Sequence, residues 1–240
     1  VELILVPTTL LSQVDSSIGG KNGINTNYGK NLVGTFYQPK LVIIDPHFLS
    51  SLPQREILSG YAEIVKHSII NDKNFFNWLN INSKEIFNLN YKVISNAIYK
   101  SVLIKKKYVL KDEKEKLKNR YSRAILNFGH TFGHALETYY NYNKKLTHGE
   151  AISIGMIISA TISYKLNYLS FKDLNKIKEH FLSNNLPIFD KKMYNAKIFQ
   201  IISKDKKIIS GKINFVLLKN IGNAFLKQDI NLKKLNKLIK

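Results

Sequence analysis

Apolar residues recur three and four positions apart through most of the chain after residue 55, with polar residues between them. This spacing predicts amphipathic helices, which we place at residues 57–70, 94–110, 130–140, 151–169 and 174–186. Before the first of them, Ser51 is a capping residue, Pro53 suits a first turn, and Gln54 lies three residues after the cap. We therefore expect Ser51 to cap the first helix.

The first fifty residues have a different pattern. Two short apolar runs, at residues 2–6 and 41–45, have the length of strands, and the Gly-, Asn- and Ser-rich segment between them predicts a loop. Near the C-terminus, runs at 212–218 and 223–226 predict a hairpin or two short extended pieces before a terminal helix rich in Lys and Leu. The pattern thus predicts two regions: an α/β segment over residues 1–55 and a mostly helical domain over residues 56–240.

Composition narrows the class of protein. The chain has 240 residues, of which 44% are hydrophobic and 11% aromatic, which is typical of a globular protein. It has no cysteine, so it forms neither disulfides nor thiolate metal sites. The longest apolar stretch, residues 151–164, is shorter than the roughly 20 residues that cross a bilayer. We expect a cytoplasmic protein without a transmembrane helix. Because Val1 leads directly into a strand-like run, we also expect a missing upstream part.

The formal charge of +20 raises the question of nucleic-acid binding. Only three of the 37 basic residues are Arg, the residue that reads bases best, and the lysines are scattered along polar faces. Lys, Asn, Ile and Tyr are all abundant, as expected for an AT-rich genome. We therefore expect no nucleic-acid partner.

Three of the six histidines lie close together in the sequence and indicate a metal site. His130 and His134 are four residues apart and share one face of a helix, while His148 begins the next apolar segment. A catalytic zinc usually takes three protein ligands, often including a carboxylate, and keeps one position open. The alternative is that these are surface histidines or hydrogen-bonded core histidines. Spacing alone does not show which carboxylate would complete a metal site.

Two further segments contain charged residues in suggestive patterns. Glu63 sits among apolar residues with Lys66 one turn later, which is either a functional carboxylate with its partner or an ordinary surface ion pair. Residues 15–25, followed by Gly-Lys-Asn at 29–31, combine glycines with lysines and amides that suit an anionic ligand such as phosphate. The spacing is not that of a Walker loop, and a solvated turn is the alternative.

Together these segments resemble the 3-dehydroquinate synthase family, which belongs to the sugar-phosphate cyclases. The resemblance covers nearly the whole chain, in family order, through VPTTLLSQVDSSIGGK at 6–21, GKN at 29–31, FYQP at 36–39, AEIVK at 62–66, LNFGHTFGH at 126–134, HGEA at 148–151 and DKK at 205–207. It implies the C-terminal part of an α/β NAD-binding domain followed by a mostly helical metal-binding domain. It also implies a homodimer.

The resemblance further implies roles for individual residues. A zinc or cobalt ion would be held by Glu63, His130 and His148, with His134 free inside the site. Residues matching the substrate-binding and catalytic positions are Asp15, Lys21, Asn31, Lys66, Lys105, Arg123, Asn127, His134 and one lysine of the pair Lys206 and Lys207. Positions that touch NAD in the family match Thr8, Thr9, Lys21, Lys30, Phe48, Leu49, Ser50 and Ser51.

The reaction that the resemblance implies converts 3-deoxy-D-arabino-heptulosonate 7-phosphate, a small sugar phosphate, to 3-dehydroquinate and phosphate in the shikimate pathway of aromatic amino acid biosynthesis. NAD⁺ takes a hydride and later returns it, so the enzyme acts as a phosphate-eliminating carbon–oxygen lyase. Arg123 and Asn127, four residues apart before His130, suit the phosphate.

This sequence departs from the family pattern in three places. It has no Gly-Gly-Gly-x-x-Gly-Asp motif for the NAD pyrophosphate, and an active-site arginine that the family supplies just upstream of residue 1 is absent. About four extra residues between Glu115 and Arg123 should lengthen the loop at 116–122. The alternatives to the synthase are another cyclase or a metal-dependent alcohol dehydrogenase of the same fold, and a non-catalytic remnant that binds zinc or supports assembly.

Overall fold

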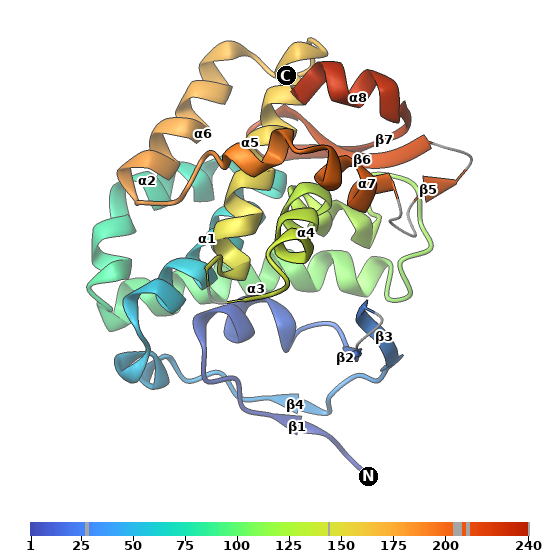
Figure 1. Cartoon of the computed structure of the whole chain (residues 1–240). Coiled ribbons are helices and arrows are strands. Elements are labelled where there is room, and N and C mark those ends of the chain that lie inside the picture. The colour runs from blue at the N-terminus through green and yellow to red at the C-terminus, as the bar shows by residue number, and fades with distance from the viewer. Residues whose placement is uncertain (27–28, 144, 204–207, 210–211, 240) are drawn as a thin grey trace.

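A small α/β segment at the N-terminus lies below a larger helical part in the computed structural model (Figure 1). The structure describes residues 1–26, 29–143, 145–203, 208–209 and 212–239. Within these ranges it describes only the backbone of residues 25–26, 29–32, 208–209, 212–213, 229–234 and 236. An α/β segment followed by a mostly helical domain is the fold class that the sequence predicts.

The N-terminal segment contains two separate pairs of strands. Strands β1 (Ile4–Leu5) and β4 (Leu41–Val42) pair in parallel, so both predicted strands form, although each contributes only two residues. The loop prediction for residues 15–25 is wrong in part. Strand β2 (Lys21–Thr26) begins there and pairs antiparallel with β3 (Gly29–Phe36). The hairpin was not predicted because its strands contain several glycines and asparagines, which weaken the alternation of apolar and polar residues.

Helix α1 (Gln54–Asn71) forms where the pattern predicts it, but Ser51 does not cap it. Ser51 ends a short 3₁₀ helix, η2 (Pro46–Ser51), which Asp45 caps by accepting a hydrogen bond from the N–H of His47. The hydroxyl of Ser51 donates back to the carbonyl of Phe48 at 3.2 Å. Pro53 therefore occupies the cap position of α1, without a side-chain hydrogen bond.

The other predicted helices are confirmed, with ends that differ by a few residues: α3 (Tyr91–Lys111), α4 (His130–Tyr139), α5 (His148–Lys165) and α6 (Phe171–Ser183). The pattern missed two helices, α2 (Lys73–Phe87) and α7 (Ala196–Ser203). Asparagines interrupt the apolar stripe of α2, and Asp72 supplies its cap by accepting from the N–H of Phe75. Short helical turns complete this part: η1 (Ser12–Ser16, π-helical), η3 (Arg123–Asn127) and η4 (Lys191–Tyr194).

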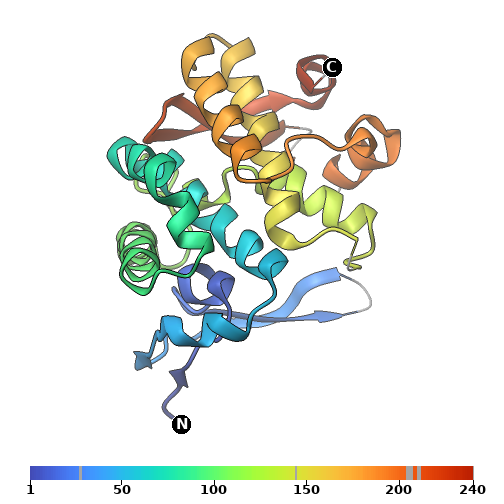
Figure 2. The same ribbon diagram turned by 90° about the vertical axis from the view of Figure 1, so that its left-hand side faces the viewer.

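Helix α5 lies at the centre of the helical part, with α1 and α4 beside it (Figures 1 and 2). Its residues belong to both apolar cores, because it packs against α1, α4, α6 and β6. A Cβ added at Gly155 would lie 2.0 Å from the carbonyl oxygen of Gly129, just before α4. A side chain at residue 155 would therefore push the start of α4 away from α5.

The C-terminal part forms the predicted hairpin and terminal helix. Strands β5 (Ile208–Ile209), β6 (Lys212–Asn220) and β7 (Asn223–Asn231) form an antiparallel sheet in that order, and α8 (Leu232–Ile239) follows. Gly222, with φ of +89°, allows the tight turn between β6 and β7. The N–H of Leu218 donates to the hydroxyl of Ser163 at 3.0 Å, which fastens β6 to α5.

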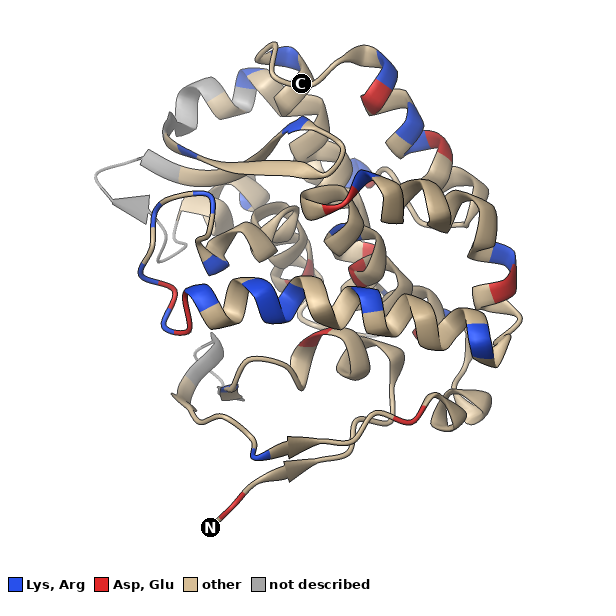
Figure 3. Cartoon of the chain, turned by 180° about the vertical axis from the view of Figure 1, so that it is seen from behind, with Lys and Arg blue, Asp and Glu red and all other residues tan. Residues whose placement is uncertain are grey.

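The lengths of the helices and the distribution of charged residues bear on whether the chain meets a membrane or a nucleic acid. In the part of the chain that the structure describes, no helix is both long and apolar enough to cross a membrane. Seen from behind, basic residues lie on several separate elements, including α3 and the segment after it, and acidic residues lie among them (Figure 3).

Candidate functional site

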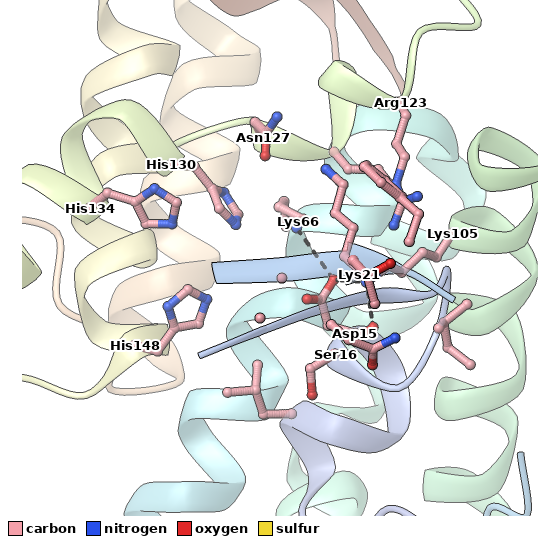
Figure 4. A pocket seen from close by; sticks show the side chains of 18 residues that line it. Asp15, Ser16, Lys21, Lys66, Lys105, Arg123, Asn127, His130, His134 and His148 are labelled. Atoms are coloured by element: carbon pink, nitrogen blue, oxygen red, sulfur yellow. Dashed lines mark hydrogen bonds and ion pairs between the residues drawn. The ribbon is translucent and has the colours of Figure 1, made fainter. Parts of the chain in front are cut away.

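A cavity of about 700 Å³ opens between the β2–β3 hairpin and the helical part (Figure 4). Its walls come from η1, the hairpin, α1, α3, η3, α4 and α5. It brings together most of the residues that the sequence analysis matched to metal, substrate and catalytic positions: Asp15, Lys21, Lys66, Lys105, Arg123, Asn127, His130, His134 and His148.

Three potential metal ligands converge at one end of this cavity. Glu63 comes from α1, His130 from the first residue of α4 and His148 from the first residue of α5. Nε2 of His148 lies 3.3 Å from Oε1 of Glu63, and Nε2 of His130 lies 3.7 Å from the same oxygen. One potential ligand atom from each of the three lies within 4.8 Å of the other two.

The imidazole rings of His130 and His148 are each oriented by a hydrogen bond at Nδ1, so that Nε2 of each ring faces Glu63. Nδ1–H of His130 donates to the carbonyl of Phe128 at 3.1 Å. Nδ1–H of His148 donates to Oε1 of Glu137, a buried carboxylate on α4, at 3.1 Å. Histidines that bind metals are commonly oriented by such contacts at the second ring nitrogen.

Burial and charge give the three residues unusual acid–base properties. Burial alone would raise the pKa of Glu63, but the Lys66 ammonium and the rings of His148 and His130 hold it well below its usual range. Burial and Lys66 hold the pKa of His130 well below its usual range. For His148, burial is outweighed by the hydrogen bond with Glu137 and by the nearby carboxylate of Glu63, which raise its pKa to about 9.

Glu63 has the features of a ligand without its ion. Its side chain is fully buried, yet within the described residues neither carboxylate oxygen accepts a hydrogen bond of good geometry. Its Oε2 lies beside the Lys66 ammonium, whereas its Oε1 faces Nε2 of His148 and of His130. The donor set of one carboxylate oxygen and two imidazole nitrogens is that of catalytic zinc sites with one open position.

Glu63 and Lys66 form an ion pair one helical turn apart, but the surface interpretation of this pair is wrong. The side chains are 0% and 1% exposed. Nζ of Lys66 also lies 4.0 Å from Oδ1 of Asp15, so Lys66 stands between the three potential metal ligands and a second group of charged residues.

Asp15 is the centre of that second group. Its Oδ1 accepts a hydrogen bond from Nζ of Lys105 at 2.7 Å, and Nε2 of His67 lies 3.9 Å away. Burial would raise the pKa of Asp15, but Lys105 and its other cationic neighbours lower it. Burial lowers the pKa of Lys105. The cavity therefore contains an organised group of ammonium ions and a carboxylate.

His134 lines the cavity but lies outside the three-residue cluster. Its Nε2 is 3.9 Å from Oε2 of Glu137, and its ring centre is 5.1 Å from that of His130 and 6.3 Å from that of His148 (Figure 4). Helical spacing alone favours His134 as a ligand beside His130. The structure instead places a carboxylate from a different helix next to His130.

Arg123 and Asn127 enter the cavity from η3. The backbone N–H of Arg123 donates to Asp112 at 2.9 Å, and its Nη1 donates to the carbonyl of Glu113 at 2.8 Å. Nδ2 of Asn127 donates to Oε1 of Glu115 at 2.9 Å, and the other oxygen of Glu115 pairs with Lys21. These contacts bind the segment before η3 to the hairpin across the cavity mouth.

Some predicted residues lie elsewhere. Residues 206 and 207 and the side chains of Lys30 and Asn31 are outside the described part of the structure. The other positions matched to NAD, except Lys21, do not line the cavity, and Leu49 is fully buried in the core. These other positions matched to NAD lie just after Pro7 and just after Asp45. Nε2 of Gln13 holds these two segments together, because it donates to the carbonyls of Pro7 at 3.3 Å and Asp45 at 2.9 Å.

Three residues of the site were not singled out from the sequence. Glu137 lies three residues after His134, so a carboxylate one turn beyond a histidine was an available signal. Glu115 stands in a run of charged residues that looks like a solvated loop. His67 is fully buried behind Asp15 and contacts Ser101, and nothing in the local pattern separates it from a core histidine.

Comparison with known proteins agrees with this geometry. Residues 1–59 match the family model described as 3-dehydroquinate synthase N-terminal, and residues 60–208 match 3-dehydroquinate synthase C-terminal. A 3-dehydroquinate synthase of Pelagibacter ubique is 49% identical over 243 residues. The match takes in 100% of this chain and 65% of the relative, so the chain spans less than two thirds of that protein's length.

Solved structures show the same fold. A 2-deoxy-scyllo-inosose synthase complexed with carbaglucose-6-phosphate, NAD⁺ and Co²⁺ has a TM-score of 0.84 and 27% identity, covering 100% of this chain and 66% of that one. A 2-epi-5-epi-valiolone synthase of Streptomyces hygroscopicus with NAD⁺ and Zn²⁺ bound has a TM-score of 0.88 and 24% identity, covering 99% and 65%. On the family models and the close relative, this chain belongs to the 3-dehydroquinate synthase family.

Proposed function

We propose that this chain is the metal- and substrate-binding part of a 3-dehydroquinate synthase, which converts 3-deoxy-D-arabino-heptulosonate 7-phosphate to 3-dehydroquinate and phosphate in the shikimate pathway. The observation that supports this most is the cavity lined by His130, His148, three lysines and an arginine, with the buried Glu63 carboxylate next to the two histidines. A metal site joined to an anion site suits an alcohol that carries a phosphate.

The metal in this proposal is Zn²⁺ or Co²⁺, held by Glu63 Oε1 and by Nε2 of His130 and His148. The fit rests on the buried carboxylate that lacks a hydrogen bond and on the two rings fixed from behind. His148, charged at neutral pH beside two carboxylates, would give up its Nε2 proton on binding the cation. When bound, the metal would polarise a substrate hydroxyl and NAD⁺ would accept a hydride from the carbon that bears it.

The residues of the chain then have separate tasks. Arg123 and Asn127, with Lys21 across the cavity mouth, bind the phosphate as a dianion. Lys66 and Lys105, whose ammonium groups are buried, attract the substrate carboxylate and hold Asp15 ionised. Asp15 accepts hydrogen bonds from substrate hydroxyls. Nε2 of His134, on the open side of the cavity, takes and returns a proton.

For NAD we propose the two segments that Gln13 holds together, around Thr8 and Thr9 and around Phe48 to Ser51. Lys21 and Lys30 would add positive charge on the hairpin. The sequence contains no glycine-rich turn of the kind that binds the NAD pyrophosphate.

We further propose a homodimer in the cytoplasm whose partner is a small sugar phosphate and not a nucleic acid. The dispersal of basic side chains over separate elements supports the second part. Duplex DNA should then bind weakly and lose its affinity steeply as salt is added.

Phosphate release from the substrate is the test. Zinc-loaded chain is incubated with the sugar phosphate and NAD⁺, and inorganic phosphate and NADH are followed together, with His134→Ala and a reaction without NAD⁺ as controls. The proposal predicts NAD-dependent phosphate release without net NADH. Net NADH accumulation would favour an alcohol dehydrogenase. A folded, zinc-loaded chain that neither binds the substrate nor releases phosphate would favour the non-catalytic remnant.

A further inference from the structure

Helices α1 and α5 touch at three successive points that lead toward the candidate metal centre. The residues on α1 are spaced four apart and share one face: Arg55, Ser59 and Glu63. They meet three consecutive residues in the first turn of α5: Glu150, Gly149 and His148. The two sets run in opposite order along the chain, so each pair forms one rung of a ladder between the helices.

The outer rung is a bidentate ion pair. Nε of Arg55 donates to Oε1 of Glu150 at 2.8 Å, and Nη2 donates to Oε2 at 2.7 Å. Nη2 also donates to the carbonyl of Lys145 at 2.9 Å. Oε2 of Glu150 accepts from the backbone N–H of Thr147 at 2.8 Å as well, and Thr147 caps α5. Arg55 therefore fixes both the first turn of α5 and the segment that leads into it.

The middle rung brings the two backbones into contact. The N–H of Gly149 has no acceptor within α5, because it belongs to the first turn, and it donates to the hydroxyl of Ser59 at 2.9 Å. A Cβ added at Gly149 would lie 2.2 Å from the carbonyl oxygen of Ser59. No side chain fits there, so the two helix backbones are in contact one residue from His148.

The inner rung joins Nε2 of His148 to Oε1 of Glu63 at 3.3 Å. The spacing of these atoms depends on how the first turn of α5 lies against α1. On α1 the outer rung lies two turns from this contact, and the middle rung lies between them.

We propose that Arg55 and Glu150 are positioning residues for the metal centre, which set the separation of Glu63 and His148 through the Ser59–Gly149 contact. This inference rests on the proposed metal site. It assigns to Arg55 a task that a lysine performs poorly, because only the planar guanidinium bonds both oxygens of Glu150 and the Lys145 carbonyl together.

An ordinary stabilising ion pair is the other interpretation of the outer rung. The Arg55 side chain is 46% exposed, and pairs this exposed add little to stability. If Arg55 and Glu150 position the ligands, replacing them must change metal binding and not only the thermal stability of the protein. Zinc affinity and the visible spectrum of bound Co²⁺ report ligand geometry directly.

The test compares Arg55→Gln, Arg55→Lys, Glu150→Gln and the double variant Arg55→Gln/Glu150→Gln with the natural chain. Arg120→Gln is a matched control, because Arg120 is exposed and its guanidinium interacts with the neighbouring Tyr121. Zinc affinity is measured by competition with a chromophoric chelator, Co²⁺ spectra are recorded, and thermal unfolding checks the fold.

We expect about tenfold weaker zinc binding and an altered Co²⁺ spectrum in Arg55→Gln and Glu150→Gln. Arg55→Lys should recover part of the loss, the double variant should be no worse than either single variant, and Arg120→Gln should match the natural chain. Zinc affinities within twofold of the natural chain in both single variants, with an unchanged Co²⁺ spectrum, would overturn the positioning role alone. Failure of the natural chain to bind zinc would overturn the metal site itself, and the positioning role with it.

Discussion

The two sides of the cavity are built differently. On the helical side, the side chains of Glu63 and Lys66 are 0% and 1% exposed and are held on α1. On the hairpin side, Lys21 is 46% exposed and Glu115, its partner, stands on a loop at 23%. Groups buried on packed helices are in place before a ligand arrives, whereas exposed side chains lose conformational freedom when they bind. On the proposed function, the helical side would hold the metal in a fixed geometry, and the exposed charges of the hairpin side would become ordered when the substrate binds.

Replacing Glu63 should have the largest effect. Glu63→Gln keeps the shape of the side chain but removes a ligand charge, so zinc should fall from about one per chain to less than about a tenth. The buried Lys66 also loses its nearest carboxylate, which should lower the free energy of unfolding by about 3 kcal/mol. Elemental analysis and urea unfolding measure the two effects.

Glu115→Gln is the matched control on the hairpin side. Because its ion pair with Lys21 is partly exposed, zinc content should stay near that of the natural chain and stability should change by less than about 1 kcal/mol. Equal zinc loss in the two variants would remove the distinction between the sides.

The lysines provide a second comparison. In metal-free protein, Lys66→Met leaves Glu63 buried without its ammonium, and the free energy of unfolding should fall by about 3 kcal/mol. Lys21→Met removes an exposed charge and should cost less than about 1 kcal/mol. Urea unfolding in the presence of a chelator measures both, and similar losses would mean that burial does not separate the two sides.

The free energy of unfolding at acid pH should depend on His180, a buried histidine of the helical part. His180 accepts a hydrogen bond at Nε2 from the hydroxyl of Tyr61 at 3.0 Å, and its Nδ1 donates to Asn80. Burial lowers its pKa to about 4. The unfolded chain, with a histidine pKa near 6.5, takes up a proton that the folded chain excludes, so stability falls as pH drops from about 6.5 to 4, by up to about 3 kcal/mol.

His180→Gln should therefore flatten the decline in unfolding free energy between pH 6.5 and 4, measured by urea unfolding at each pH. His47→Gln is the exposed control, because the His47 side chain is 72% exposed in the N-terminal segment. Parallel profiles for the natural chain and His180→Gln would show that His180 does not contribute to acid sensitivity.

The smallest predicted effect concerns anion binding at the cavity mouth. Lys21→Met should weaken binding of inorganic phosphate by about threefold, since a partly exposed lysine contributes little in water. The dissociation constants are measured by phosphorus NMR at fixed ionic strength. A loss of a hundredfold or more would mean that the hairpin is already organised around the anion.

The sequence predicted those parts of the fold whose signals are local. Thr147 and Glu150 form a capping box at the start of α5, and Gly222 turns the hairpin that follows β6. The cap prediction failed at Ser51 because a neighbouring 3₁₀ helix uses that residue, which depends on Asp45 and not on the pattern around Ser51. Helix α2 was missed because asparagines break its apolar stripe.

The candidate site was predictable only where residues share one helix or where the family resemblance joined distant ones. His130 and His134 gave the first signal, yet the carboxylate next to His130 comes from α1, 67 residues away in the sequence. Glu137 and Glu115 gain their partners, His148 and Lys21, only when α5 and the hairpin pack beside them. No periodicity in a sequence records such contacts.

Zinc content of three purified proteins tests the central claim most directly: the natural chain, His148→Ala and His134→Ala. The two histidines lie in the same cavity, but only His148 lies within the cluster around Glu63. Our account predicts about one zinc per chain in the natural protein and in His134→Ala, and almost none in His148→Ala. Zinc lost from His134→Ala and kept in His148→Ala would contradict it.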